Sequence, residues 1–211
     1  DKGPRLAYGG TEPGRTAREL LPEMVAAALQ RLPIPKRMRW GRSRAEFVRP
    51  VHWLVLLHGA EVVPARILDA APDRTTQGHR FMGTGAIELA TPDEYERRLR
   101  EEGRVEPAME RRQALIRQQA QELAAEHDGV PVYDEALLEE VAALVEWPVA
   151  LVGRFDERFL EVPAEALISS MQGHQKCFPI RGKQGLLPLF IAVSNIESRD
   201  PQQVIAGNER V

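Results

Sequence analysis

The sequence predicts an α+β fold with mixed or antiparallel sheets and packed helices. Segments typical of strands and of helices are mixed along the chain, without the strict alternation of a parallel α/β fold. Helical periodicity dominates after Thr91, whereas short apolar runs bounded by Gly and Pro occur in both halves. The 211 residues, 43% hydrophobic and 28% charged, have the composition of a globular chain with one large or two small domains.

The first element that we expect is an amphipathic helix over residues 16–32. Thr16 and Glu19 have capping-box spacing, but Pro22 is too deep for a helix that starts there, so the helix either begins near Leu21 or bends. The stretch that follows, from Arg31 to Pro50, contains one acid and seven basic residues: Arg31, Lys36, Arg37, Arg39, Arg42, Arg44 and Arg49.

Two apolar runs, residues 51–57 and 61–68, flank the short connection "HGA" and predict a β-hairpin. Pro64 suits an edge or a bulge in it. The glycine-containing sequence "QGHRFMGTG" predicts a loop, and "AIELA" predicts a strand after it.

From Thr91 onward the pattern is mainly helical. Thr91, Pro92 and Glu94 indicate a helix start, and Gly103 is placed to end that helix. Two further helices are expected over residues 110–126 and 134–148. Their predicted apolar faces are Leu115, Ile116, Leu123 and Ala124 in the first, and Leu137, Leu138, Val141, Leu144 and Val145 in the second.

The last quarter predicts a strand at 149–153, a helix at 163–172, and strands at 176–180 and 189–195. We expect one region over residues 1–103, with the first helix, the basic loop and the hairpin, and a second over 104–211. One continuous domain is the alternative.

Cys177, the only cysteine, lies in "SSMQGHQKCFPI" close to His174 and Lys176. A catalytic thiol needs a lowered pKa and exposure. In a strand, however, Cys177 would point away from Lys176, and unpaired cysteine behaves as a small buried hydrophobe. We therefore predict a core residue rather than a thiol nucleophile, and we expect "GHQK" to be a polar loop suited to phosphate or carboxylate contact.

Other signatures of catalytic or metal sites are missing from the sequence. The five histidines lack zinc-ligand spacing, and no phosphate-binding or dinucleotide-binding glycine motif occurs. Glu139, Glu140 and Glu146 are typical of a solvated helix face. The residues alone thus indicate no catalytic group, no metal and no bound cofactor.

Charge gives a local rather than a global signal for nucleic acid. Lys and Arg total 28 against 31 Asp and Glu, a formal charge of -3. The basic stretch, with Trp40 inside it, has the Arg-plus-aromatic composition used to hold phosphates and stack bases. A solvated stretch with Trp40 packed against a neighbouring strand is the alternative.

The single cysteine fits a reducing cytoplasm, and no apolar run reaches the roughly 18 residues that span a bilayer. The start lacks both Met and a signal-peptide pattern, so we expect an internal fragment of a longer chain.

Several long segments together resemble the β subunit of bacterial heterotetrameric glycyl-tRNA synthetase. They run collinearly along the chain and include "LLPEMVAAALQRLPIPKRMRWG", "FVRPVHW", "GHRFMG", "LLEEVAALVEWPVAL", "FLEVPAEALISSMQGHQKCFPI" and "VSNIESRDPQQVIAGNERV". The resemblance implies a ligase that joins glycine to tRNA-Gly while converting ATP, with Mg, to AMP and diphosphate. It implies an α2β2 assembly in the cytoplasm whose α subunit carries the class II active site, with no membrane or DNA partner. "FVRPVH" lacks the acid of a class II arginine motif, which agrees with an adenylation site elsewhere.

The resemblance also bears on Cys177 and on the architecture. The family usually has tyrosine at this position, which argues further against thiol chemistry. The region is similar to the B3/B4 region of phenylalanyl-tRNA synthetase β chains, where mischarged tyrosine is hydrolysed. We do not expect editing here, because a pocket that fits glycine excludes larger amino acids sterically.

We predict that this segment docks tRNA, positions the α subunit, or does both. The predicted phosphate contacts are Lys36, Arg37, Arg39, Arg42 and Arg44, with His79, Arg80, His174, Gln175 and Lys176 as a second group. A scaffold that does not touch RNA is the main alternative, and a thiol hydrolase at Cys177 is a third hypothesis.

Overall fold

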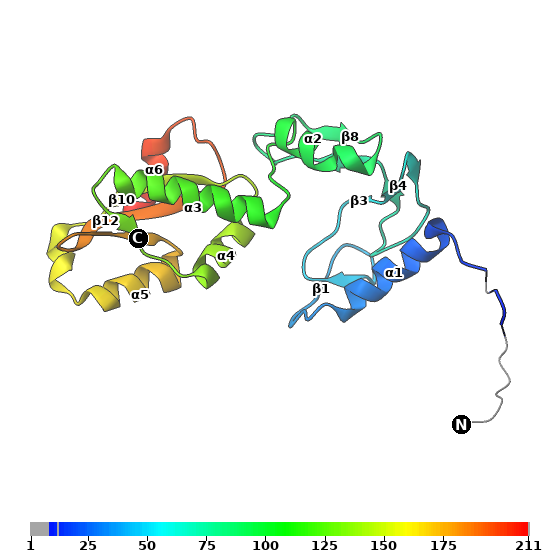
Figure 1. Cartoon of the computed structure of the whole chain (residues 1–211), viewed down its shortest axis with the longest axis horizontal. Helices are drawn as coiled ribbons and strands as arrows, with labels where there is room; N and C mark the ends of the chain where they lie inside the picture. The colour runs from blue at the N-terminus through cyan, green and yellow to red at the C-terminus, as the bar shows by residue number, and fades with distance from the viewer. Residues whose placement is uncertain (1–8, 12, 211) are drawn as a thin grey trace, which may run out of the picture. The chain divides into compact units, whose positions relative to one another are not determined.

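The computed structural model describes residues 9–11 and 13–210. The chain divides into two compact units. One runs to Thr76 and includes Glu88–Pro92, and the other comprises Gln77–Ile87 and Asp93–Val211. Helices and small, mainly antiparallel sheets occur along the chain (Figure 1), so the α+β prediction is confirmed. The predicted division at residues 103 and 104 and the likeness to a B3/B4 region stay predictions.

The first unit combines one helix, α1 (Ala17–Arg31), with two-residue strands. β1 (Met38–Arg39) and β2 (Glu46–Phe47) pair antiparallel, as do β4 (Leu57–His58) and β5 (Glu61–Val62), whereas β3 (Leu54–Val55) and β6 (Pro72–Asp73) pair parallel. The predicted hairpin at "HGA" is thus present, although its strands are far shorter than the apolar runs suggested.

Helix α1 begins at Ala17, not near Leu21. The Glu19 carboxylate accepts hydrogen bonds from the Thr16 backbone N–H (2.9 Å) and hydroxyl (3.0 Å), and this contact fixes the start. Pro22 lies inside the helix, and no residue of α1 is buried. The small core of this unit contains Val63, Ile67 and Leu89.

The chain passes between the units along the ribbon of β7 (Thr75–Gln77) and β8 (Ala86–Glu88). A short 3-10 turn, η1 (Pro92–Glu94), then leads into α2 (Tyr95–Glu101). Gly103 ends that helix as predicted. A Cβ there would lie 2.6 Å from the Leu99 carbonyl oxygen, so the position accepts only glycine.

The second unit is built on a four-stranded antiparallel sheet. Its strands are β9 (Val130–Pro131), β10 (Val149–Arg154), β11 (Phe178–Gly182) and β12 (Gly185–Ser194), in the order β10-β12-β11-β9. The helices are α3 (Met109–Ala125), α4 (Glu135–Leu144), α5 (Ala164–Gln175) and α6 (Pro201–Glu209), with a 3-10 segment η2 (Glu157–Glu161).

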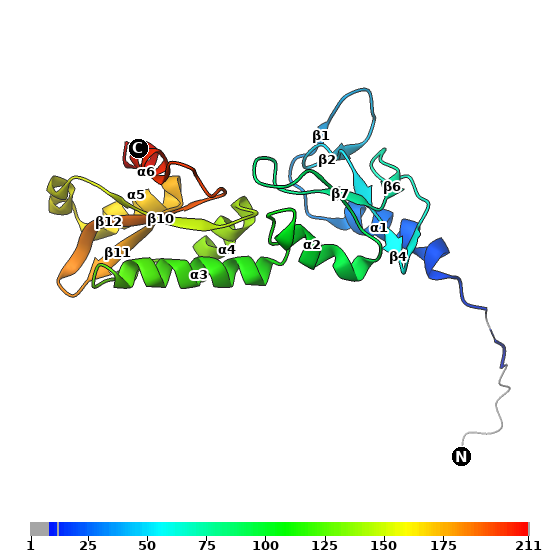
Figure 2. The ribbon, with the colours of Figure 1, turned by 90° about the horizontal axis from the view of Figure 1, so that it is seen from above.

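Alternation along β12 divides the core of this unit in two. Leu189 and Ile191 face α3 and α4 and join the larger cluster, whereas Phe190 and Ala192 join a smaller cluster with Cys177 and Met171 of α5. Figure 2 shows α3 and α6 on opposite sides of the sheet. The site described below lies on the side of α5 and α6.

The predicted helix faces need two corrections. Leu144 is 64% exposed, because α4 ends there and Val145 is already extended, so the helical spacing no longer applies. Leu115 is 39% exposed, and the buried stripe of α3 consists of Ile116, Ala120 and Ala124.

Among the described residues, no helix combines the length and hydropathy required to cross a bilayer.

Candidate functional site

The five predicted phosphate contacts lie on and around the β1–β2 hairpin of the first unit. All five side chains are exposed. Arg39 pairs with Glu46, its partner across the hairpin, at 3.2 Å. Among the described residues, no acidic side chain pairs with the other four, Lys36, Arg37, Arg42 and Arg44. The hairpin therefore presents cations that are open to an external anion.

Local contacts hold the loop that carries these cations. Gly41 has a φ of +55°, which suits the tight turn after β1. The Ser43 hydroxyl bonds the Asp69 carboxylate and accepts the Ala45 N–H at 2.8 Å. Trp40, the predicted base stacker, is half-buried in this loop.

The "GHRF" loop belongs to the second unit and is organised by His79. His79 is only 5% exposed, and its Nδ1 accepts the backbone N–H groups of Phe81 (3.2 Å) and Met82 (3.3 Å). Its own backbone N–H donates to the Gly103 carbonyl at 2.6 Å. Arg80 and Phe81 are the residues of this loop that face solvent, and the Arg80 guanidinium lies 5.7 Å from the Phe81 ring.

The predicted "GHQK" loop is a helix end. Gly173, His174 and Gln175 form the last turn of α5, and Lys176 caps it with a left-handed φ of +55°. The Lys176 ammonium pairs with Glu140 at 2.9 Å, whereas His174 and Gln175 are exposed. The prediction of a loop was wrong, because the helix continues through Gly173 until the chain turns into β11.

Cys177 is a core residue, as predicted. It is 4% exposed, and its thiol lies 3.5 Å from the Gln175 carbonyl oxygen. Burial raises the pKa of the Cys177 thiol to about 11. The thiol is therefore protonated near neutral pH and is a poor nucleophile.

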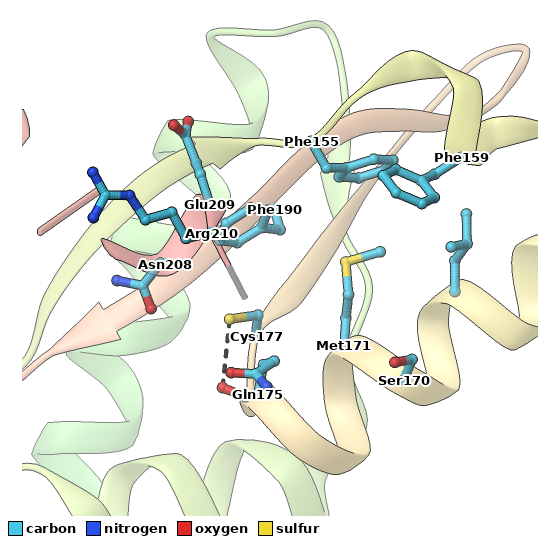
Figure 3. A pocket seen from close by; sticks show the side chains of 11 residues that line it. Phe155, Phe159, Ser170, Met171, Gln175, Cys177, Phe190, Asn208, Glu209 and Arg210 are labelled. Atoms are coloured by element: carbon cyan, nitrogen blue, oxygen red, sulfur yellow. Dashed lines mark hydrogen bonds between the residues drawn. The ribbon is translucent and has the colours of Figure 1, made fainter. Parts of the chain in front are cut away.

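Beside Cys177 the second unit has a pocket of about 340 Å³ (Figure 3). Its walls come from the segment after β10 and from η2, from α5 and the residues that follow it, from β12 and from the end of α6. The lining residues are Phe155, Phe159, Leu167, Ser170, Met171, Gln175, Cys177, Phe190, Asn208, Glu209 and Arg210.

Sequence reasoning singled out only Gln175 and Cys177 of this lining. The available signal was aromatic clustering, since Phe155, Phe159, Phe178 and Phe190 are four of only six phenylalanines in the chain. Phe178 points into the larger core and the other three line the pocket.

A second cavity, of about 410 Å³, lies beside Trp147 and Glu106. The Glu106 carboxylate is buried and bonded to Arg100 and Arg111. These bonds occupy the carboxylate, so we interpret Glu106 as a structural group. Elsewhere in the described part of the chain, no group of three or more His, Cys, Asp and Glu side chains could hold a metal ion.

Comparison with known proteins gives one consistent result. Residues 1–211 match the model of a family described as glycyl-tRNA synthetase beta subunit. Similar proteins named glycine–tRNA ligase beta subunit come from Chromohalobacter salexigens (57% identity), Hahella chejuensis (54%) and Edwardsiella ictaluri (52%). Each alignment covers all of this chain and 31% of the relative, so the chain spans about a third of the length of these proteins.

Proposed function

Because the chain belongs to the glycyl-tRNA synthetase β-subunit family, we propose that it is part of a glycine–tRNA ligase and contributes a surface that docks tRNA-Gly. The holoenzyme would join glycine to tRNA-Gly at the expense of ATP, in the cytoplasm, as an α2β2 assembly. We assign glycine, ATP and its magnesium to the α subunit, so that this segment acts through binding rather than through chemistry.

The observation that carries the docking proposal is the hairpin with its unpaired cations. Lys36, Arg37, Arg42 and Arg44 are exposed and lack acidic partners among the described residues. Cations in this state bind phosphates by releasing counterions, without first breaking an internal ion pair. Because Asp69 holds Ser43, the loop is partly ordered before binding, which lowers the entropic cost of docking.

A salt series tests the proposal. We expect the 211-residue chain to bind tRNA-Gly with a steep loss of affinity as salt rises. Replacing Lys36, Arg37, Arg39, Arg42 and Arg44 with Gln should reduce the slope of log K against log salt by about 3.5 to 4.5, since each of the five phosphate contacts contributes about 0.7 to 0.9.

Two double variants with the same loss of charge test whether the position of the cations or only the net charge of the chain matters for RNA binding. Arg42→Gln with Arg44→Gln removes two hairpin cations, and Arg181→Gln with Lys183→Gln removes two exposed cations from the second unit. Only the first pair should flatten the slope. Equal effects of both pairs would mean that general charge, and not the hairpin, attracts RNA.

A scaffold that positions the α subunit is the second candidate, and helix α1 favours it. None of its residues is buried, and Met24 is 61% exposed. A helix without a buried face leaves its surface free to contact another protein. If neither the parent chain nor the five-residue variant bound tRNA-Gly, the scaffold function would replace the docking function.

A further inference from the structure

The pocket beside Cys177 is polarised along its length. Figure 3 shows Phe155, Phe159 and Met171 together toward one end, and Asn208, Glu209 and Arg210 together toward the other. We propose that this pocket binds a ribonucleotide, either free or as an unpaired nucleotide of RNA, with the base at the aromatic end and the ribose and phosphate at the polar end.

The aromatic end has the features of a base-stacking site. Phe159 is 42% exposed, so its ring is open to a ligand as well as lining the pocket. The Arg158 guanidinium lies 5.1 Å from the Phe159 ring and supports the ring through a cation–π contact. Flat bases stack on aromatic rings regardless of their sequence, and the Ser170 hydroxyl at this end offers a hydrogen bond to a base edge.

The polar end has acceptors and a cation that the fold leaves available. Asn208 Nδ2 donates to the Val204 carbonyl at 2.8 Å, and Glu209 Oε1 accepts the Arg154 N–H at 2.8 Å. These bonds orient both side chains and leave Asn208 Oδ1 and Glu209 Oε2 without a partner among the described residues. Carboxylate oxygens are common acceptors for ribose hydroxyls.

Arg210 completes the polar end. It is exposed and has no ion pair with any described acid. A free guanidinium at the mouth of a pocket suits a phosphate group, which it can bind through two parallel hydrogen bonds.

The size and chemistry of the pocket favour a nucleotide over an apolar protein side chain. A volume of about 340 Å³ falls in the range of small-molecule pockets. An apolar side chain would fill only the phenylalanine end and would leave Asn208, Glu209 and Arg210 unused. Because the Cys177 thiol is protonated, we expect binding without covalent chemistry.

Titration of the 211-residue chain with AMP, followed by ligand-observed NMR, tests the site. Arg210→Gln and Phe159→Leu should each weaken AMP binding by about tenfold, the size expected for one charge-assisted contact or one stacked base. Arg199→Gln and Phe81→Leu are the matched controls, since both residues are exposed and neither lines the pocket, and they should change nothing. Deoxy-AMP should bind more weakly than AMP if Glu209 holds the ribose.

A second arm with a single-stranded adenosine tetranucleotide identifies the source of the nucleotide. Tighter binding of this RNA, with the same sensitivity to Arg210→Gln and Phe159→Leu, would assign the pocket to RNA, whereas binding of AMP alone would assign it to a free nucleotide. No binding of either probe up to about 10 mM, or binding that both variants leave unchanged, would overturn the proposal.

Only the RNA arm rests on the proposed tRNA docking. The two proposals can fail separately, because the hairpin variant should keep its AMP affinity and the pocket variants should keep the salt slope for tRNA-Gly.

Discussion

Replacing Glu106 with glutamine tests how the second unit holds a buried charge. The Glu106 side chain is only 3% exposed, and its carboxylate accepts Arg100 Nε at 2.9 Å, Arg111 Nε at 3.0 Å and the Ala108 N–H at 3.2 Å. Burial alone raises the pKa of Glu106, but these hydrogen bonds outweigh it, and the pKa lies below its ordinary value of 4.5. Glutamine keeps the shape and removes the charge.

We expect Glu106→Gln to lower the free energy of unfolding by about 2–3 kcal/mol. A hydrogen bond to a charged group contributes about 1.5–3 kcal/mol and a neutral one about 0.5–1.5 kcal/mol. Both arginine contacts are weakened because glutamine is neutral. One of the two guanidinium groups must also face the amide NH2 group, which cannot accept its hydrogen bond. The Arg100 and Arg111 side chains are 38% and 47% exposed, so water compensates in part. The loss therefore stays below the roughly 3–5 kcal/mol of a fully buried pair.

Urea unfolding followed by Trp147 fluorescence measures this loss. Trp40 and Trp53, which lie in the first unit, are first replaced by Phe. Glu101→Gln is the control, because the Glu101–Arg97 pair is exposed and should contribute less than about 0.5 kcal/mol.

The loss should also depend on pH. Because the folded pKa of Glu106 is depressed, its carboxylate stabilises the fold above the unfolded pKa, and this contribution disappears as the pH falls through the folded pKa. The difference between the parent and Glu106→Gln should therefore shrink in acid. A difference equal to that of Glu101→Gln, or one that is undiminished near about pH 3, would refute the reasoning.

Two further predictions concern single side chains of the second unit. With a pKa of about 11, roughly one Cys177 thiol in a thousand is ionised at about pH 8, so its reaction with DTNB should be slow in the folded chain and rise about tenfold per pH unit. Rapid labelling near neutral pH, in a chain shown to be folded by circular dichroism, would contradict this. On α4, Leu138→Ala should cost about 2–5 kcal/mol in urea unfolding, because Leu138 is fully buried. Leu144→Ala should cost less than about 0.5 kcal/mol, and a similar cost for both would mean that Leu144 is packed.

Local signals predicted most elements of the fold, and the misses have identifiable causes. Capping-box spacing placed the start of α1 at Thr16, whereas Pro22 suggested either a later start or a bend. The helix begins directly after Thr16 and includes Pro22. At the end of α4, Leu144 and Val145 both fit the helical period. Only the backbone shows that Val145 has left the helix and turned into the core, while Leu144 faces solvent.

The sequence predicted the exposed cations of the hairpin but not the pocket beside Cys177. Exposed cations such as Arg42 follow from composition, because charged side chains seldom lose water. The pocket depends on long-range contacts, since Phe155, which follows β10, meets Met171 and Arg210 only when α5 and α6 pack on the same face of the sheet. His79 and His174 looked alike in sequence, as histidines that follow a glycine, but His79 is buried and bonded to backbone whereas His174 is exposed at a helix end.

The path of the chain between the units affects its synthesis. The first unit includes Glu88–Pro92, and Leu89 is fully buried and donates its backbone N–H to the Arg74 carbonyl at 3.0 Å. A ribosome must therefore translate Gln77–Ile87, which belongs to the second unit, before the first unit has all of its core. A nascent chain that has emerged only as far as Thr76 would expose the apolar space that Leu89 later fills, so we expect a chaperone to protect the growing polypeptide at this stage.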